Sequence, residues 1–185
     1  MELIKKTNVQ NNFRYERKFT LTAASRQEPL HYIKRHPAFF REIFEPRQIN
    51  NIYFDTPELQ FYFDNKKGIA DRKKVRIRWY GETFGKVTKP TLEFKIKKGL
   101  VGDKWSYPLS DFEIEKGITK ADIFDVFGKS YLPKPIFESL QNLSPALLNT
   151  YQRTYFRSAN KIFRLTFDEK LDFYRIGNRN NNFIE

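Results

Sequence analysis

The sequence predicts an α+β fold in which a few helices are interspersed among the strands of an antiparallel sheet. Several short segments alternate polar and apolar side chains, the pattern of a strand with one buried face. Turn residues separate these segments at short intervals, and other segments begin with helix-capping residues instead. Nineteen Phe, ten Tyr and two Trp residues supply large apolar groups for the core.

The composition predicts one soluble domain that binds an anion. The 185 residues are expected to form a single domain, residues 1–185. A net charge of +12 favours nucleic acid, nucleotide, polyphosphate or an acidic membrane surface as partner. No cysteine occurs, which excludes disulfides and thiolate chemistry. Because neither a signal peptide nor a run of about 18 apolar residues is present, we expect a cytoplasmic protein without direct membrane insertion.

The N-terminal half is expected to alternate strands with short helices. Ser25 followed by Glu28 has the spacing of a capping box. Thr56 and Pro57 suit the N-cap and first turn of a second helix. The predicted helices are residues 26–36 and 56–68, and the predicted strands are residues 13–20, 48–55 and 72–81.

The C-terminal half is expected to contain two hairpins and a less regular middle region. Residues 81–90 form the predicted loop of the first hairpin, and Ser158–Asn160 form the turn of the second. Capping spacings predict helix starts at Ser110 and Thr119. The remaining predicted elements are strands at 91–98, 104–109, 147–158, 161–170 and 171–176, and one helical stretch within 133–145.

One predicted strand has an almost entirely cationic polar face. In RKKVRIRWYG, residues 72–81, one face carries Arg72, Lys74, Arg76 and Arg78, and the other carries Val75, Ile77 and Trp79. A half-solvated sheet explains alternation in any single strand. Long cations nevertheless recur in the strand at 13–20, the strand at 91–98 and the last hairpin. A closed or strongly curved sheet with these rows inward would form a cationic cavity, and a bound polyanion would relieve the repulsion.

The residue types in these rows suit phosphate. Arginine binds phosphate oxygens through two nitrogens, and lysine supplies a point charge. We assign a catalytic role to Lys18, Arg76, Arg78 and Lys95, and phosphate binding to Lys74, Arg153 and Arg164. Phosphoryl transfer requires positioning and charge neutralisation more than a nucleophilic side chain, so the cavity suits an enzyme or a binding protein.

Three carboxylates lie on the same expected faces and are candidate metal ligands. Mg²⁺ is often held by one or two carboxylates, with phosphate and water completing the shell. The candidates are Glu16, Glu93 and Asp168. Pairing of each carboxylate with neighbouring cations is an equally good explanation. Other constellations are weak: His31 and His36 are better explained as surface or packing residues than as a metal pair, and neither a phosphate-binding glycine loop nor a catalytic triad signature occurs.

Several segments together resemble the VTC (vacuolar transporter chaperone) domain, the polyphosphate polymerase domain of the triphosphate tunnel metalloenzyme, or CYTH-like, superfamily. Each segment is unspecific alone, but their order covers most of the chain. The matching stretches are RYERKF (14–19), NNIYFDT (50–56), KVRIRWYG (74–81), LEFKIKK (92–98), YQRTYF (151–156) and FRLTFDEKL (163–171).

The resemblance implies an antiparallel, eight-stranded β tunnel barrel with flanking helices and a basic lining. Such a tunnel would bind ATP or another nucleoside triphosphate with Mn²⁺ or Mg²⁺, and transfer its terminal phosphate to polyphosphate. Arg14 stands where many relatives of the superfamily have a glutamate, which favours the VTC branch. The family continues past NRNNNFIE with a further strand and helix, so we expect the C-terminus of the domain to be incomplete.

Two other functions remain open at this stage. A metal-dependent triphosphatase of the same fold would use water as the acceptor of the phosphate. A noncatalytic module would bind a polyanion or nucleic acid; aromatic residues between cations can stack bases, but here they form the expected core face, so nucleic acid is not expected. The resemblance is also compatible with a membrane-associated partner protein.

Overall fold

The structure, a computed structural model, describes residues 16–21, 25–99, 101–115, 117–177 and 181. These residues form a six-stranded antiparallel sheet of order β5-β4-β2-β1-β7-β8 and a two-stranded sheet of β3 and β6. The strands are β1 (Arg41–Asp55), β2 (Arg72–Tyr80), β3 (Gly85–Val87), β4 (Thr91–Lys98), β5 (Val101–Pro108), β6 (Phe112–Ile114), β7 (Ser144–Arg157) and β8 (Arg164–Arg175). The helices are α1 (Gln27–Arg35), α2 (Gln60–Lys66), α3 (Lys120–Lys129) and α4 (Lys134–Leu140). The predicted α+β class is confirmed.

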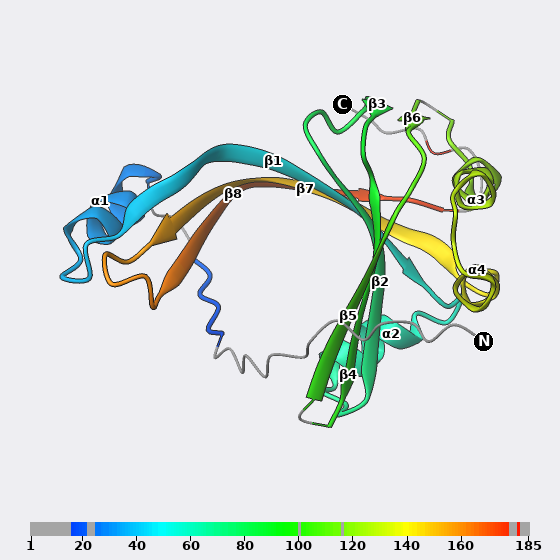
Figure 1. The fold of residues 1–185 in the computed structure, drawn as a ribbon, viewed down its shortest axis with the longest axis horizontal. Coiled ribbons are helices and arrows are strands. Elements are labelled where there is room, and N and C mark those ends of the chain that lie inside the picture. The colour runs from blue at the N-terminus through cyan, green and yellow to red at the C-terminus, as the bar shows by residue number, and fades with distance from the viewer. Residues whose placement is uncertain (1–15, 22–24, 100, 116, 178–180, 182–185) are drawn as a thin grey trace, which may run out of the picture.

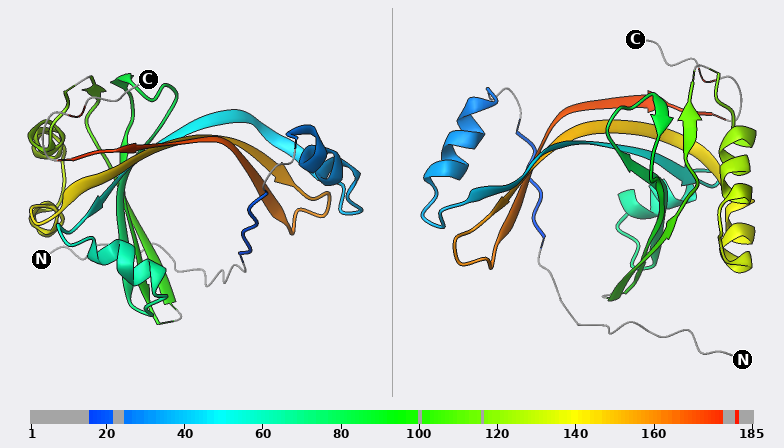
Figure 2. Two further views of the ribbon diagram at one scale, coloured as in Figure 1. Left: turned by 180° about the vertical axis from the view of Figure 1, so that it is seen from behind. Right: turned by 45° about the horizontal axis from the view of Figure 1, so that its top comes forward.

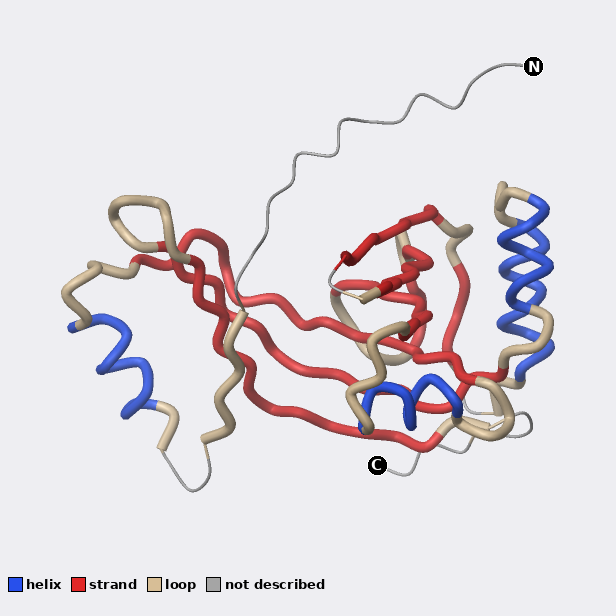
Figure 3. The backbone as a smooth tube through the Cα atoms, turned by 90° about the horizontal axis from the view of Figure 1, so that it is seen from below, coloured by secondary structure: helices blue, strands red, loops and turns tan. Residues whose placement is uncertain are grey.

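The large sheet is bent into an arch. The long strands β1, β7 and β8 sweep toward α1, whereas β2, β4 and β5 descend from the other end (Figure 1). The three long strands run side by side when seen from below (Figure 3). Their register shifts at three places between β1 and β7 and once between β7 and β8. An extra residue at such a bulge bends the strand and increases its twist, which accounts for the curvature.

The sheet does not close within the described residues. β5 pairs only with β4, and β8 pairs only with β7, so both are edge strands. The two views of Figure 2 show the arch open on its concave side. A closed, eight-stranded tunnel barrel is therefore not confirmed. Closure would require further strands between β5 and β8.

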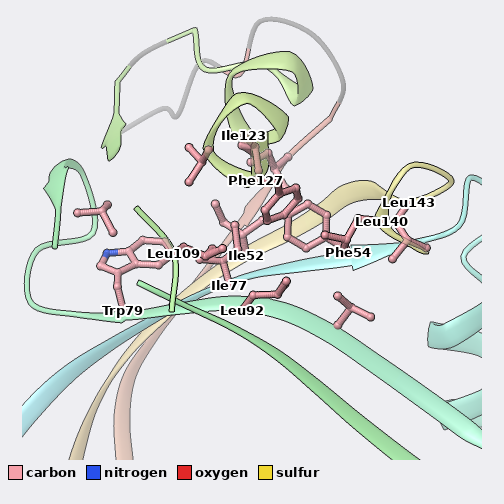
Figure 4. Packing of buried hydrophobic residues seen from close by; sticks show 14 of the residues in the cluster. Ile52, Phe54, Ile77, Trp79, Leu92, Leu109, Ile123, Phe127, Leu140 and Leu143 are labelled. Carbon is pink, nitrogen blue, oxygen red and sulfur yellow. The ribbon is translucent and has the colours of Figure 1, made fainter. Parts of the chain in front are cut away.

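The core lies on the face of the sheet that α3 and α4 cover. Ile52 of β1 and Ile77 of β2 are fully buried there and face Phe127 of α3. Figure 4 shows these side chains packed with Trp79, and Phe54 lies with its ring centroid 5.6 Å from that of Phe127. Because strand side chains alternate, burial of this row turns the cations of β2 to the opposite, concave face.

A capping box starts α3, as the sequence predicts. The Thr119 hydroxyl accepts a hydrogen bond from the Asp122 N–H, and the Asp122 carboxylate accepts one from the Thr119 N–H. We expect Thr119→Ala to lower the free energy of unfolding by about 1 kcal/mol in urea titrations. Thr88→Ala, in an exposed loop, is the matched control, and equal losses in the two variants would contradict the assignment.

Two helix starts differ from the prediction. α1 is present, but the Glu28 N–H bonds the backbone carbonyl of Ser25 instead of a side-chain cap. α2 begins at Gln60 instead of at Thr56. The Thr56 hydroxyl still accepts the N–H of Gln60, and the buried Asp55 carboxylate accepts the N–H groups of Phe61 and Tyr62, so the two side chains cap the first turn together.

The middle of the chain contains a small sheet where a loop and a helix start are predicted. Val87, within the predicted loop 81–90, pairs with Phe112. The helix predicted from Ser110 is wrong, because residues 112–114 form β6 and bury Ile114. The Ser110 hydroxyl instead donates to the carbonyl oxygen of Lys129 at the end of α3. This small sheet depends on contacts between distant segments, which local patterns do not encode.

The first predicted strand is not seen. Residues 16–20 have no regular secondary structure, and residues 13–15 lie outside the described ranges.

The last hairpin is confirmed as β7 and β8. The two strands predicted at 161–170 and 171–176 form one strand, β8, with a bulge at Lys170, whose φ is 53°. The helical stretch predicted within 133–145 is α4.

Candidate functional site

The concave face of β2, β4 and β5 carries a cluster of cations around a single carboxylate. Cross-strand register pairs Arg76 with Glu93, and it sets Lys74, Lys95 and Lys104 side by side on three neighbouring strands. Arg78 lies next along β2 on the same face. We call this set the basic cluster: Lys74, Arg76, Arg78, Lys95 and Lys104, with Glu93 at its centre.

Glu93 binds its cationic neighbours through both carboxylate oxygens. Its Oε2 accepts hydrogen bonds from Nε (2.8 Å) and Nη2 (2.6 Å) of Arg76, and its Oε1 accepts one from Lys104 Nζ (2.6 Å). Arg78 Nη1 lies 3.9 Å from Oε2. The Glu93 side chain is 8% exposed. A buried carboxylate so placed holds the guanidinium groups in fixed positions.

The neighbouring strand β1 orients both arginines through neutral groups. Arg76 Nη1 donates to the Tyr53 hydroxyl (3.2 Å), and Arg78 Nε donates to Asn51 Oδ1 (3.0 Å). The Asn51 amide in turn donates to Asn149 Oδ1 on β7 (3.0 Å). These groups position the arginines without neutralising them, so the positive charge of the site is preserved.

The pKa values of Glu93 and Lys74 reflect the excess of positive charge in the basic cluster. Burial alone would raise the pKa of the Glu93 carboxyl, but hydrogen bonds from Lys104 and Arg76 hold it below its ordinary value. Burial lowers the pKa of the Lys74 ammonium, and neighbouring positive charges lower it further. Those neighbours are Lys18, Lys95, Arg72 and Arg76. Like charges on directly opposite strand positions destabilise a sheet, so the cluster stores repulsion that an anion would relieve.

Arg153 lies on the same face but outside the basic cluster. It pairs with Asp168 across β7 and β8, with Nε and Nη2 each 2.6 Å from a different carboxylate oxygen. Tyr151 and Tyr155 flank the guanidinium group at 5.1 and 6.0 Å. Arg47 is its partner position on β1. The charge of Arg153 is therefore balanced by Asp168 within the protein.

The other predicted residues lie apart from this cluster. Arg164 is at the far end of the arch, where it pairs in register with Arg157. Lys18 and Glu16 are exposed on the N-terminal segment, 3.7 Å from one another. Lys18 is one of the charges that lower the pKa of Lys74, but its segment has no regular secondary structure and is not a strand of the sheet.

The structure does not bring the three predicted metal ligands together, and a metal role for any of them stays a prediction. Glu93 is engaged by Arg76 and Lys104, Asp168 is engaged by Arg153, and Glu16 is on the N-terminal segment. No group of three His, Asp or Glu side chains suited to a metal ion occurs in the described part of the chain. The equally good explanation, pairing with neighbouring cations, is what the structure has for each carboxylate.

Sequence reasoning missed several residues of the site. Lys104 lies in a predicted strand, but the sequence does not show its neighbours across the sheet. The register between β4 and β5 brings it opposite Lys95. Tyr53 and Asn51 belong to NNIYFDT, whose polar side chains carry no charge and therefore gave no signal. Pairing of NNIYFDT with the cationic strand, with polar side chains on the same face, is the signal that points to both residues.

A comparison with models of protein families identifies the family of this chain. The family model of the VTC domain matches residues 13–183. The chain belongs to the VTC domain family. A search of curated proteins finds no match to this sequence. The VTC domain family is associated with polyphosphate polymerase, and the match extends over all the strands that the structure describes. Among its described helices, none combines the length and the apolar character needed to cross a membrane.

Proposed function

We propose that this VTC domain binds a nucleoside triphosphate and polyphosphate on its basic cluster and acts as a polyphosphate polymerase that uses ATP. The observation that carries the proposal is the ratio of charges in the cluster: five cations surround one carboxylate on a concave face. A row of phosphates supplies the missing negative charge. Membership of the VTC family favours polyphosphate over other polyanions.

In the proposed reaction the terminal phosphate of the growing chain attacks the γ-phosphorus of ATP in line. The bond between the β–γ bridging oxygen and the γ-phosphorus breaks, ADP leaves, and the chain gains one phosphate. Arg76 and Arg78 would hold phosphate oxygens in place, and Lys74 and Lys95 would offset charge on the transferred group. Mn²⁺ or Mg²⁺, whose ligands would come largely from phosphate oxygens and water, would add further neutralisation.

The reaction is tested by incubating the protein with ATP and Mn²⁺ or Mg²⁺ and measuring ADP, free phosphate and polyphosphate. The proposal expects polyphosphate and ADP from the wild type and a large loss in Arg76→Ala. Free phosphate without chains would assign a triphosphatase. Binding of polyphosphate without turnover of ATP would assign a noncatalytic module. Indistinguishable wild-type and Arg76→Ala proteins would reject the site itself.

Tripolyphosphate binding should weaken at alkaline pH, because Lys74 then loses its proton. Its pKa is lowered in the free protein, and a bound anion favours the charged ammonium, so binding raises that pKa. We therefore expect tripolyphosphate binding to take up protons between the two pKa values and to weaken as pH rises through the lower one. Calorimetric titration in two buffers of different ionisation enthalpy measures the uptake, which Lys74→Met should reduce. Equal uptake in Lys97→Met, a matched lysine outside the basic cluster, would contradict this origin.

A further inference from the structure

The far end of the arch is built from two segments that carry several cations and no carboxylate. Residues 31–41 run from α1 into β1, and residues 157–164 connect β7 to β8. A backbone hydrogen bond from the Ala159 N–H to the Ala38 carbonyl oxygen (3.0 Å) joins them. We call the two segments together the tip; it lies beside α1 in Figure 1. Its cations are Lys34, Arg35, Arg41, Arg157, Lys161 and Arg164.

The tip also exposes large apolar side chains. Phe39 is 67% exposed, Ile162 is 73% exposed and Phe163 is 57% exposed. Tyr32, on the part of α1 that belongs to the tip, is exposed as well. A single exposed apolar side chain needs no explanation, but several of them at one end of a molecule mark an interaction surface.

The backbone of the tip is held in place, so these side chains are presented by a defined structure. The Ser158 hydroxyl accepts the Phe163 N–H (2.9 Å), and Asn160 Oδ1 accepts both the Ser158 hydroxyl (2.7 Å) and the Ile162 N–H (3.1 Å). Phe39 has a φ of 49°, a left-handed conformation that a bulky residue rarely adopts. A strained residue kept by its surroundings is typical of functional segments.

An acidic membrane surface fits this combination of side chains. Aromatic and aliphatic groups enter the headgroup region of a bilayer, while lysine and arginine bind the charged lipid headgroups. A chain of phosphates would leave the apolar groups in water. The core of a protein–protein interface is depleted of charge, whereas here Lys161 and Arg164 directly flank Ile162 and Phe163.

We propose that the tip is a peripheral membrane site, at which Phe39, Ile162 and Phe163 enter the headgroup region of an acidic bilayer and the cations around them bind its lipid headgroups. The inference goes beyond the proposed function and does not rest on it. Contact through two short segments is reversible, so binding depends on acidic lipid and on salt. The strands β2, β4 and β5 lie at the other end of the arch (Figure 1), so the basic cluster remains accessible while the tip is bound.

The test is sedimentation of the protein with vesicles of phosphatidylcholine, with and without phosphatidylserine. The apolar variant combines Phe39→Asn with Ile162→Ser. Asparagine suits the left-handed backbone at position 39, so this variant should fold at least as well as the wild type. The matched control combines Tyr131→Asn with Val101→Ser, which removes two exposed apolar side chains outside the tip.

A second pair of variants tests the charge. Lys34→Gln with Lys161→Asn removes two exposed cations of the tip, and Lys129→Gln with Lys134→Gln removes two exposed cations of α3 and α4. We expect each tip variant to weaken binding to the acidic vesicles about tenfold or more, because each removes two groups that contact the bilayer. Both controls should bind as the wild type does, and tripolyphosphate affinity should stay within about twofold in all variants.

Entry into the bilayer is measured with a dye. The chain has no cysteine, so Ala159→Cys places a single environment-sensitive fluorophore in the tip. Its emission should shift to shorter wavelength when acidic vesicles are added, whereas a dye at Tyr131→Cys should show no shift.

The outcomes separate the inference from the proposed function. A wild type that binds tripolyphosphate but not acidic vesicles would overturn the inference alone. Acidic vesicle binding that is unchanged in both tip variants would also overturn it, and so would tip variants that lose affinity for polyphosphate as strongly as for vesicles. Vesicle binding without tripolyphosphate binding would support the inference and overturn the proposed function.

Discussion

Replacement of Arg76 by alanine is expected to weaken tripolyphosphate binding by about 100-fold. Hydrogen bonds from a charged group contribute about 1.5–3 kcal/mol each, and a guanidinium that holds phosphate through two of them accounts for at least 3 kcal/mol, or two factors of ten in affinity. Arg76 has the position for this role because Glu93 and Tyr53 already hold its side chain in place.

The measurement is calorimetric titration of folded proteins at fixed salt. Arg76→Lys should lie between wild type and Arg76→Ala, because the charge remains but the planar fork is lost. Arg35→Ala, on an exposed arginine at the end of α1, removes the same charge elsewhere and should have little effect. A loss in Arg35→Ala as large as in Arg76→Ala would show that net charge, and not the basic cluster, determines binding.

Replacement of Glu93 by glutamine is expected to separate stability from binding. The variant leaves Arg76, Lys104 and Arg78 without their shared counter-ion, and removal of one partner from a buried ion pair costs roughly 3–5 kcal/mol. Because Lys104 is half exposed and water screens its charge, we expect a smaller loss in the free energy of unfolding, about 2–3 kcal/mol, in urea titrations. Tripolyphosphate binding should become tighter at the same time, because the cations no longer share their charge with the carboxylate.

The pH dependence of stability provides a second readout on Glu93. Its pKa is lowered in the folded protein, so its contribution is fully present above the pKa of the unfolded chain. That contribution is lost as pH falls through the lower, folded value. Glu93→Gln should abolish this part of the acid dependence, whereas Glu113→Gln, at an exposed position of β6, should not. Weaker tripolyphosphate binding by Glu93→Gln without added metal would show that the carboxylate chiefly positions Arg76.

Local patterns predicted the main strands well. The cationic strand became β2 because Val75, Ile77 and Trp79 must be buried, and alternation then turns Arg76 and Arg78 outward. The cap of α3 was also predictable, because a capping box involves residues only three positions apart. Predictions failed where distant segments compete for a short stretch, as at Phe112, whose pairing with Val87 overrides the helix signal at Ser110.

Alternation of side chains along each strand was enough to predict cationic rows, a positively charged face and an α+β sheet, since these depend on neighbours in the chain. Only the tertiary structure decided which rows meet. Register brings Lys104 to Lys95 and Glu93 to Arg76, and it separates Arg164 from them by the length of the arch. The reason is that periodicity determines the face on which a side chain lies, whereas strand order, register and bulges determine its distance from every other side chain on that face.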